Sequence, residues 1–176
     1  AHELLRNQFI KRNVVGPQIL PLGIPINTKF SNSTDKTKAR EMLGISPDKF
    51  TILLMSGGAA YGNLPKLLKS IDELDFDFQL LCVCGKNKPK YLRISKLIPK
   101  LKKTYYLYGF VDNVDIMMDA SDCLISKPGG LSSSEALAKK LPLIIVNPIP
   151  GQEERNAEFF LNNGAAMLSS KTFPVD

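Results

Sequence analysis

Apolar residues in this chain gather in short runs, and each run is followed by a segment whose apolar positions have helical spacing. The runs are FTILLMSGG, FQLLCVCG, TYYLYGF, DCLISKPGG, LPLIIVNPIPG and AAML. Runs without polar alternation are typical of strands buried on both faces of a sheet. Strands that alternate with helices favour parallel pairing through right-handed crossovers. The pattern therefore predicts an α/β fold, a Rossmann-like doubly wound parallel sheet.

Helices are expected between these runs and before the first of them. Spacing and end signals predict helices at residues 33–44, 63–74, 88–101, 111–120, 131–140 and 152–164. Near the start, apolar residues recur at helical spacing at Leu4, Leu5, Phe9 and Ile10. A proline-punctuated extended segment follows. We expect residues 1–176 to form a single domain in which residues 1–30 are a lead-in helix and linker. Both ends look cut, so we expect a fragment of a longer protein.

The composition adds a moderate positive charge. The chain has 23 Lys and Arg against 17 Asp and Glu, a net charge of +6, with 44% hydrophobic residues. This bias favours a phosphate-bearing or other polyanionic partner, or an anionic membrane surface. No stretch approaches the ~20 apolar residues that a membrane span needs. The chain is therefore expected to be soluble or peripheral to a membrane.

The three cysteines, Cys82, Cys84 and Cys123, lie within the apolar runs. Buried thiols behave as small apolar groups, and free cysteines are typical of a reducing compartment. Their spacing matches no zinc site. We therefore expect inert core thiols and no metal site.

Glycines crowd several of the loops that should lie outside the carboxyl ends of the strands, where ligands of doubly wound sheets bind. Gly57, Gly58 and Gly62 follow the first strand, but their spacing is not G-x-G-x-x-G and no lysine directly follows the last of them. The next strand ends in CVCGK, with no acid placed to bind an adenosine ribose. Dinucleotide binding and an NTPase phosphate loop are both disfavoured.

The stretch SKPGGLSSSE predicts a sharp turn that runs into a helix. The turn is formed by Pro128, Gly129 and Gly130. The amides of Gly130, Leu131 and Ser132 are then expected at a helix N-terminus with free N–H groups. Backbone dipoles in this arrangement bind anions such as a diphosphate. A tight turn without any ligand explains the same glycines equally well.

Glu135 has two interpretations. Ser132-x-x-Glu135 matches a capping box, in which the two side chains satisfy backbone amides of the first helical turn. Alternatively, the carboxylate lies one turn beyond the free amides and accepts hydrogen bonds from the two hydroxyls of a nucleotide ribose. The spacing does not separate these alternatives.

The loop PIPGQEERN places Gln152, Glu153 and Asn156 at the start of another helix at the same edge of the sheet. Amide and carboxylate side chains in fixed positions suit the many hydroxyls of a sugar. A solvated first helical turn, with its acids placed for the helix dipole, is the alternative.

The stretch SKPGGLSSSEALAKKLPLIIVNPIPGQEERNAEFFLNNGAA strongly resembles the donor-binding segment of the monogalactosyldiacylglycerol synthases and processive diacylglycerol glucosyltransferases, in glycosyltransferase family 28. The wider superfamily includes the N-acetylglucosaminyltransferase of peptidoglycan lipid II synthesis. The similarity covers nearly the whole chain, from LPLGIPI through LLMSGGAAYGNL and YGFVDNV to GAA. The resemblance implies the C-terminal half of a two-domain GT-B fold, which holds a UDP-sugar, while an absent N-terminal domain holds a lipid acceptor.

The resemblance also implies a role for each donor-binding residue. The implied set is Gly57, Gly58, Phe110, Val111, Gly129, Gly130, Leu131, Ser132, Glu135, Gln152, Glu153 and Asn156. The backbone around Phe110 and Val111 would read the uracil edge, Glu135 would hold the ribose, and the amides of residues 130–132 would hold the diphosphate.

The remaining members of the set would meet the sugar and the far side of the phosphates. Gln152, Glu153 and Asn156 would contact the hexose. Gly57 and Gly58 would let a loop approach the phosphates.

One position departs from the family pattern, which often continues Glu-Gly-Asn or Glu-Glu-Asn after the glutamine. This chain has Glu154-Arg155-Asn156 instead. The cation of Arg155 could face solvent, the phosphates or an acidic membrane, and the sequence does not decide among them.

The activity implied by the resemblance is an inverting transfer of a hexose from a UDP-hexose to a lipid, with diacylglycerol as the expected acceptor and no cofactor. The chain has one histidine, His2, far in sequence from the donor loops. We therefore expect the catalytic base in the N-terminal domain, and donor binding without turnover by this chain alone. The alternatives are a UDP-GlcNAc-dependent transferase acting on an undecaprenyl-linked peptidoglycan intermediate, and a non-catalytic nucleotide-sugar sensor.

A basic run, KNKPKYLRISKLIPKLKK, bears on the expected location, which is cytoplasmic and peripheral to the membrane. The run fits a solvated helix face or a patch attracted to anionic lipid headgroups. No nucleic-acid recognition motif accompanies it, so we expect no nucleic-acid partner.

Overall fold

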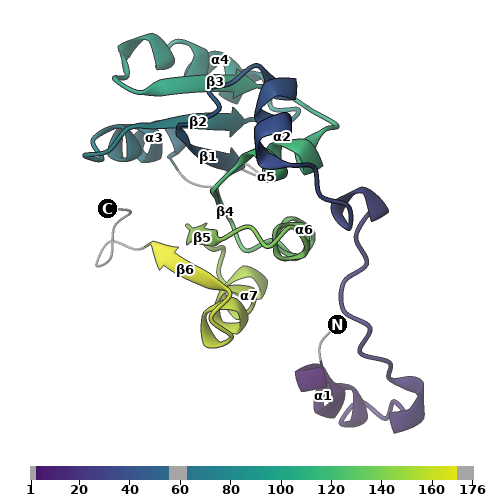
Figure 1. Cartoon of the computed structure of the whole chain (residues 1–176). Helices are drawn as coiled ribbons and strands as arrows, with labels where there is room; N and C mark the ends of the chain where they lie inside the picture. Colours follow the sequence, from purple (N-terminus) through teal and green to yellow (C-terminus); the bar gives the residue numbers. More distant parts are fainter. Residues whose placement is uncertain (1–2, 56–62, 170–176) are drawn as a thin grey trace.

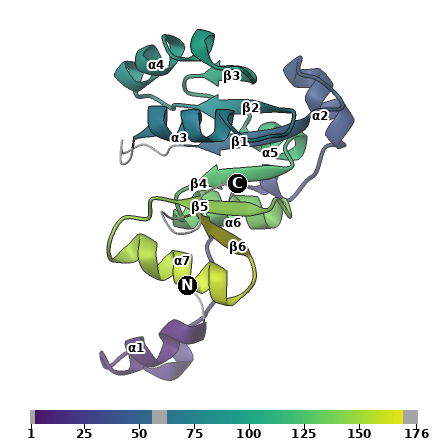
Figure 2. The same ribbon diagram turned by 90° about the vertical axis from the view of Figure 1, so that its left-hand side faces the viewer.

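A single parallel sheet organises the domain. The computed structural model describes residues 3–55 and 63–169. Within these residues, six strands pair in the order β3-β2-β1-β4-β5-β6, and every pair is parallel (Figures 1 and 2). The strands are β1 (Phe50–Met55), β2 (Phe78–Val83), β3 (Thr104–Tyr108), β4 (Cys123–Ser126), β5 (Leu143–Val146) and β6 (Ala166–Ser169). The predicted α/β class and doubly wound parallel sheet are confirmed.

Helices connect the strands and cover both faces of the sheet. They are α1 (Arg6–Ile10), α2 (Lys36–Leu43), α3 (Leu64–Asp72), α4 (Lys88–Ser95), α5 (Val114–Ala120), α6 (Gly130–Ala138) and α7 (Gln152–Asn162). Short 3-10 helices are η1 (Glu3–Leu5), η2 (Gly16–Gln18), η3 (Thr28–Phe30) and η4 (Ile98–Lys100). α3 and α4 lie on one side of β1 to β3, while α2 and α5 lie on the other (Figure 1). α1 lies apart from the sheet at the end of an extended linker (Figure 1).

The alternation of side chains along each strand builds two separate cores. On β1, Leu53 points into the core that also contains Met117 of α5 and Phe160 of α7. Its neighbour Leu54 points into the other core, with Leu68 of α3. All three cysteines are buried, as predicted. None of the helices in the described ranges is long and apolar enough to cross a bilayer.

Burial on both faces holds for the inner strands but not for the two edges of the sheet. β1 and β2 are buried almost throughout. β3 is only half-buried along its length, and on β6 Met167 is 74% exposed. The prediction that every strand is buried on both faces is therefore wrong at β3 and β6. An edge strand has a neighbour on one side only, so solvent reaches its side chains from the open edge.

The single helix predicted over residues 88–101 is also wrong. α4 ends at Ser95, and a separate 3-10 turn, η4, contains Pro99. Proline has no N–H to donate, and its ring disfavours helical geometry in the residue before it. The apolar spacing continues through this region, but the backbone cannot follow it as one helix.

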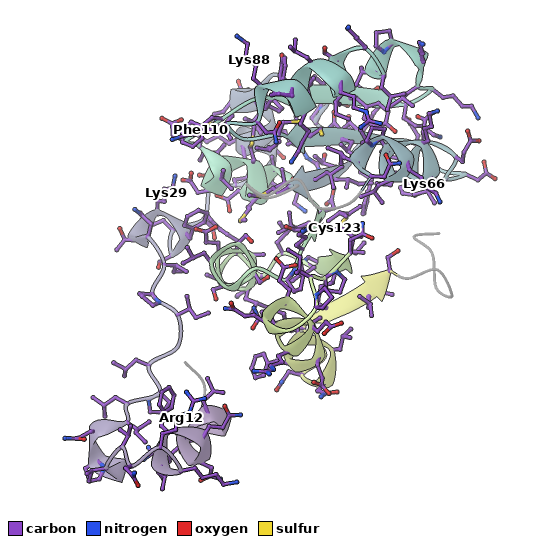
Figure 3. The ribbon with its side chains drawn as sticks, turned by 180° about the vertical axis from the view of Figure 1, so that it is seen from behind. Arg12, Lys29, Lys66, Lys88, Phe110 and Cys123 are labelled. Carbon is purple, nitrogen blue, oxygen red and sulfur yellow. The ribbon has the colours of Figure 1, made fainter. Side chains whose placement is uncertain are left out.

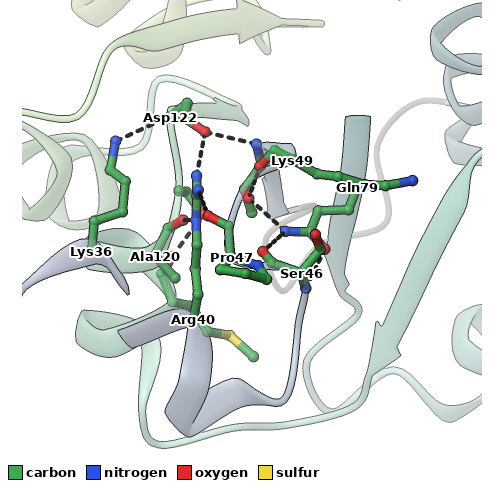
Figure 4. Close-up of polar contacts among 11 residues, drawn as sticks. Lys36, Arg40, Ser46, Pro47, Lys49, Gln79, Ala120 and Asp122 are labelled. Carbon is green, nitrogen blue, oxygen red and sulfur yellow. Dashed lines mark hydrogen bonds and ion pairs between the residues drawn. The ribbon is translucent and has the colours of Figure 1, made fainter. Parts of the chain in front are cut away.

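Asp122 anchors the amino ends of the central strands (Figure 4). Its Oδ2 accepts hydrogen bonds from Arg40 Nη2 and from the backbone N of Thr51, each 2.7 Å long. Its Oδ1 accepts a 2.7 Å bond from Lys36 Nζ. Arg40 is 6% exposed and also donates to the carbonyl of Ala120 at 3.0 Å. One carboxylate therefore joins α2, β1 and the segment that leads into β4.

The protonation state of Asp122 follows from these contacts. Burial alone would raise the pKa of Asp122, but the hydrogen bonds from Lys36 and Thr51, with the positive charges of Lys36 and Arg40, outweigh it and hold the pKa below its ordinary value. A carboxylate with a lowered folded-state pKa stabilises the protein above the unfolded-state pKa. This stabilisation is present at neutral pH and is lost as the pH falls through the folded-state pKa.

The two cations that contact Asp122 should differ sharply in their effect on stability. Arg40→Met should lower the free energy of unfolding by about 3 kcal/mol, because it leaves a partly buried carboxylate without its buried partner. Lys36→Met, at a side chain that is 48% exposed, should lower it by less than about 1 kcal/mol. Denaturant unfolding at neutral pH measures both, and equal losses from the two variants would contradict the assigned roles.

Candidate functional site

The candidate site lies at the carboxyl edge of the sheet, where the strand order reverses between β1 and β4. Ser126 Oγ, at the end of β4, donates a 3.1 Å hydrogen bond to the carbonyl of Met55, at the end of β1. Crevices at such reversal points are the usual ligand sites of open α/β sheets. Gly57 and Gly58 follow β1 in sequence, but they lie outside the described residues.

The amino end of α6 presents unpaired amides at this edge. The helix begins at Gly130, and its N-cap Gly129 supplies no side-chain cap. Ser133 is the first residue whose N–H meets a helical partner, the carbonyl of Gly129 at 3.0 Å. The amides of Gly130, Leu131 and Ser132 have no acceptor among the described residues. The predicted helix start with free N–H groups is confirmed, and its binding of a diphosphate stays a prediction.

Close neighbouring side chains, rather than an unusual backbone angle, mark the two glycines at this helix start. Gly129 has φ −70°, which any residue can adopt. A Cβ at Gly129 would lie 3.3 Å from Ser132 Oγ, and one at Gly130 would lie 3.2 Å from Ile24 Cδ1. Ile24 belongs to the linker before the sheet. The linker therefore lies against the amino end of α6.

Glu135 is not part of a capping box. The N-cap of α6 is Gly129, so Ser132 and Glu135 both lie within the helix. The Glu135 side chain makes no hydrogen bond or ion pair with any residue in 3–55 or 63–169. Burial raises the pKa of Glu135, and the nearby charge of Lys29 offsets part of that rise. A half-buried carboxylate without a partner, one turn beyond free amides, is a candidate ligand-binding group.

The start of α7 is joined to the loop that precedes α6. Asn156 Nδ2 donates a 2.9 Å hydrogen bond to the carbonyl of Pro128. Glu153 Oε2 accepts a 2.8 Å bond from the backbone N of Ile149, which fixes the turn before α7. Gln152 is exposed at the first position of the helix. The three residues predicted to meet a hexose therefore lie on one helical turn beside the α6 loop.

Gly151 explains how the chain enters α7. Its φ of 98° lies in a region that only glycine adopts without strain. Its backbone N donates a 2.9 Å hydrogen bond to Glu154 Oε2. The acidic residue thus satisfies one of the free amides at the helix start. Arg155, the departure from the family pattern, is exposed and makes no ion pair within the described part of the chain.

The loop after β3 forms the next part of the edge. Phe110 is 66% exposed, and Lys86 Nζ lies 4.9 Å from the centre of its ring. Val111 is half-buried and packs against the core that contains Met117. The backbone between these two residues is where the resemblance places uracil recognition, and no contact in the structure tests that role.

Lys29 is a site residue that the sequence analysis missed. Its Nζ donates a hydrogen bond to the carbonyl of Asp112 and lies 3.3 Å from Asp115 Oδ1. It thus holds the loop after β3, and its charge also acts on Glu135. Lys29 and Phe110 lie on the same flank of the domain (Figure 3). A single lysine within a linker carries no periodic signal, so only the tertiary structure reveals this contact.

Comparison with known proteins identifies the family. Residues 35–168 match the family described as Glycosyl transferases group 1. The chain is 37% identical to the processive diacylglycerol β-glucosyltransferase of Bacillus pumilus, over 97% of this chain and 45% of that protein. It is 34% identical to the enzyme of the same name from Bacillus licheniformis, over 97% of this chain and 47% of that protein. The chain thus spans about half the length of these curated relatives.

Solved structures agree on the fold. The Anabaena protein Alr3699/HepE, solved in complex with UDP-glucose, superposes with a TM-score of 0.66 at 16% identity, covering 96% of this chain and 48% of that one. MurG from Acinetobacter baumannii superposes with a TM-score of 0.65 at 18% identity, covering 89% of this chain and 45% of that one. At such identities the likeness shows the fold alone. With its family match, its relatives and its parallel sheet in agreement, the chain belongs to the Glycosyl transferases group 1 family and is homologous to the processive diacylglycerol β-glucosyltransferases.

Proposed function

We propose that this chain is the UDP-sugar-binding, C-terminal half of a glycosyltransferase that transfers a hexose from a UDP-hexose to diacylglycerol. One observation carries the proposal: three amides at the start of α6 and the carboxylate of Glu135, one turn later, all lack a partner among the described residues. The amides suit a diphosphate, and the carboxylate suits the two hydroxyls of a ribose. The names of the relatives favour glucose as the hexose.

The β-linkage in the names of the relatives fits a reaction in which the acceptor displaces UDP from the sugar in one step. They are called β-glucosyltransferases, and glucose is α-linked in UDP-glucose, so transfer inverts the anomeric carbon. In this half, the amides of α6 stabilise the charge that develops on the departing diphosphate. The base that deprotonates the acceptor hydroxyl lies in the other half of the protein. His2, the only histidine of this chain, lies outside the described residues.

Two other functions make different demands on the protein. A UDP-GlcNAc-dependent transferase acting on an undecaprenyl-linked intermediate would need UDP-GlcNAc as its donor and that intermediate as its acceptor. A nucleotide-sugar sensor would bind donor but lack the catalytic base in the adjoining domain. Competition among UDP-glucose, UDP-galactose and UDP-GlcNAc, followed by acceptor assays on the full-length protein, separates them.

The chain should bind UDP, and Glu135 should dominate the affinity. Glu135→Ala should weaken UDP binding roughly 100-fold, because two charge-assisted hydrogen bonds to the ribose are lost. Glu41→Ala, which removes an exposed carboxylate on α2, is the matched control and should leave the affinity unchanged. Isothermal titration calorimetry measures both variants. Equal affinities for wild type and Glu135→Ala would reject the ribose role.

The charge of Glu135 should favour UDP binding but lower the stability of the free protein, and this cost in stability should depend on pH. Because its folded-state pKa is raised by burial, the folded protein binds this proton more tightly than the unfolded chain does. The free energy of unfolding therefore falls as the pH rises from the ordinary pKa of glutamate through the raised one. Glu135→Gln should remove this dependence, raise the melting temperature at pH 7 and weaken UDP binding. A variant that loses both stability and UDP affinity would indicate a structural role instead.

The chain alone should transfer no glucose. UDP-glucose and diacylglycerol in mixed micelles should give no glucosyldiacylglycerol with this chain, while the same sample binds UDP, because the base is absent. Thin-layer chromatography with radiolabelled donor measures the product. Turnover above the no-protein background would overturn the assignment of the base to the other half.

A further inference from the structure

A groove on the α3 and α4 side of the sheet carries a concentration of positive charge that the donor site does not use. It has a volume of about 690 Å³ and runs between α3, α4 and the turn that follows α4. Its cations are Lys66, Lys69, Arg93, Lys96, Lys100 and Lys102. Lys66 on α3 lies on the flank opposite Lys29 and Phe110 (Figure 3). None of the described residues that line the groove belongs to the predicted donor-binding set.

Most of this charge has no acidic partner among the residues that the structure describes. Lys102 pairs with Glu73 at 2.7 Å. The other acid of the groove, Asp72, is 4% exposed and accepts hydrogen bonds from the backbone N of Lys102 and Lys103 and from Tyr105. The remaining cations make no ion pair with any residue of the described ranges: Lys66, Lys69, Arg93, Lys96 and Lys100. Five unpaired cations on adjoining elements favour a ligand with several negative charges.

The other lining residues indicate which polyanion fits. Leu97, Leu101 and Pro65 contribute apolar surface to the groove. No aromatic side chain is among its lining residues in the described part of the chain, whereas single-stranded nucleic acids are bound by stacking on aromatic rings. Lysines around apolar surface match the interface of a bilayer, where phosphates lie above the ends of acyl chains.

We propose that this groove docks the protein on a bilayer of anionic phospholipids, with the phosphates of the headgroups against the five unpaired cations. The choice of a bilayer over other polyanions rests on the proposed function, because an enzyme that glycosylates diacylglycerol must work at a membrane surface. The charge and shape of the groove do not depend on that function. The docking surface and the donor site can therefore be tested separately.

The test is cosedimentation with vesicles of phosphatidylcholine, with and without phosphatidylglycerol. Wild type should bind only the anionic vesicles, and high salt should release it. The triple variant Lys69→Glu, Lys96→Glu, Lys100→Glu should reduce partitioning at least about 100-fold, since each lysine near an anionic surface adds roughly fivefold. The same lysines changed to glutamine provide a milder variant, which should also reduce binding.

The matched control has the same change in net charge away from the groove: Lys11→Glu, Lys38→Glu, Lys140→Glu, all at exposed positions. It should keep most of the vesicle binding. Equal losses from the two triple variants would overturn the proposal, because net charge alone would then explain binding. Inorganic phosphate or glycerol phosphate is added at the phosphate concentration of the vesicles. If either releases the protein from the vesicles, the groove binds a free phosphate and the proposal is overturned. Stronger binding to a single-stranded oligonucleotide than to anionic vesicles would also overturn it.

UDP binding, measured on every variant, separates this proposal from the proposed function. Both triple variants should bind UDP as wild type does, which also shows that they fold. If wild type binds UDP but does not bind anionic vesicles, the docking groove is rejected and the proposed donor site is not. Vesicle binding through the groove without any UDP binding would reject the donor site and leave the docking groove in place.

Discussion

The parallel pairing of β1 with β4 is the constraint on which the rest of the site depends. In this register Met55 lies beside Ser126, so the two strands end together at the carboxyl edge of the sheet. The hydrogen bond from Ser126 Oγ to the carbonyl of Met55 fixes that alignment at the edge. α3, which follows β1 in sequence, packs in one core through Leu68, and α6, which follows β4, packs in the other through Ala136. The free amides of α6 therefore lie at a reversal of strand order, where open α/β sheets usually bind ligands.

A carboxylate that stabilises the fold and the carboxylate proposed to bind ligand lie toward opposite ends of the sheet. At the amino ends, the carboxylate of Asp122 is satisfied by Arg40, Lys36 and the amide of Thr51. At the carboxyl ends, the carboxylate of Glu135 has no partner among the described residues, and burial disfavours its charge. One acid thus contributes to folding, and the other carries a folding cost that a ligand would relieve. Charged groups with perturbed pKa values that carry a folding cost are typical of ligand sites, whereas satisfied charges such as Asp122 stabilise the scaffold around them.

Much of this fold could be predicted from the sequence because its signals are local. Apolar runs and their following helices gave the order of elements, and the Pro-Gly-Gly turn gave the start of α6. Edge exposure of β3 and β6 could not be predicted, because which strands lie at the edges depends on the order of pairing. The capping role of Ser132 and Glu135 also stayed open, since the motif does not say where its helix begins. Lys29 was missed because its partners, Asp112 and Asp115, are more than 80 residues away in sequence.

The linker residues that reach the site change where the functional unit begins. The family match begins at residue 35, and α2 begins at Lys36. Yet Ile24 lies over the amino end of α6, and Lys29 holds the loop after β3. A version of the domain trimmed to the family match would lose both of these contacts. It would also lose Phe30, which is 3% exposed and lies in the core that contains Met117. The linker therefore serves packing as well as the candidate site, and expression designs for this domain should start upstream of Ile24.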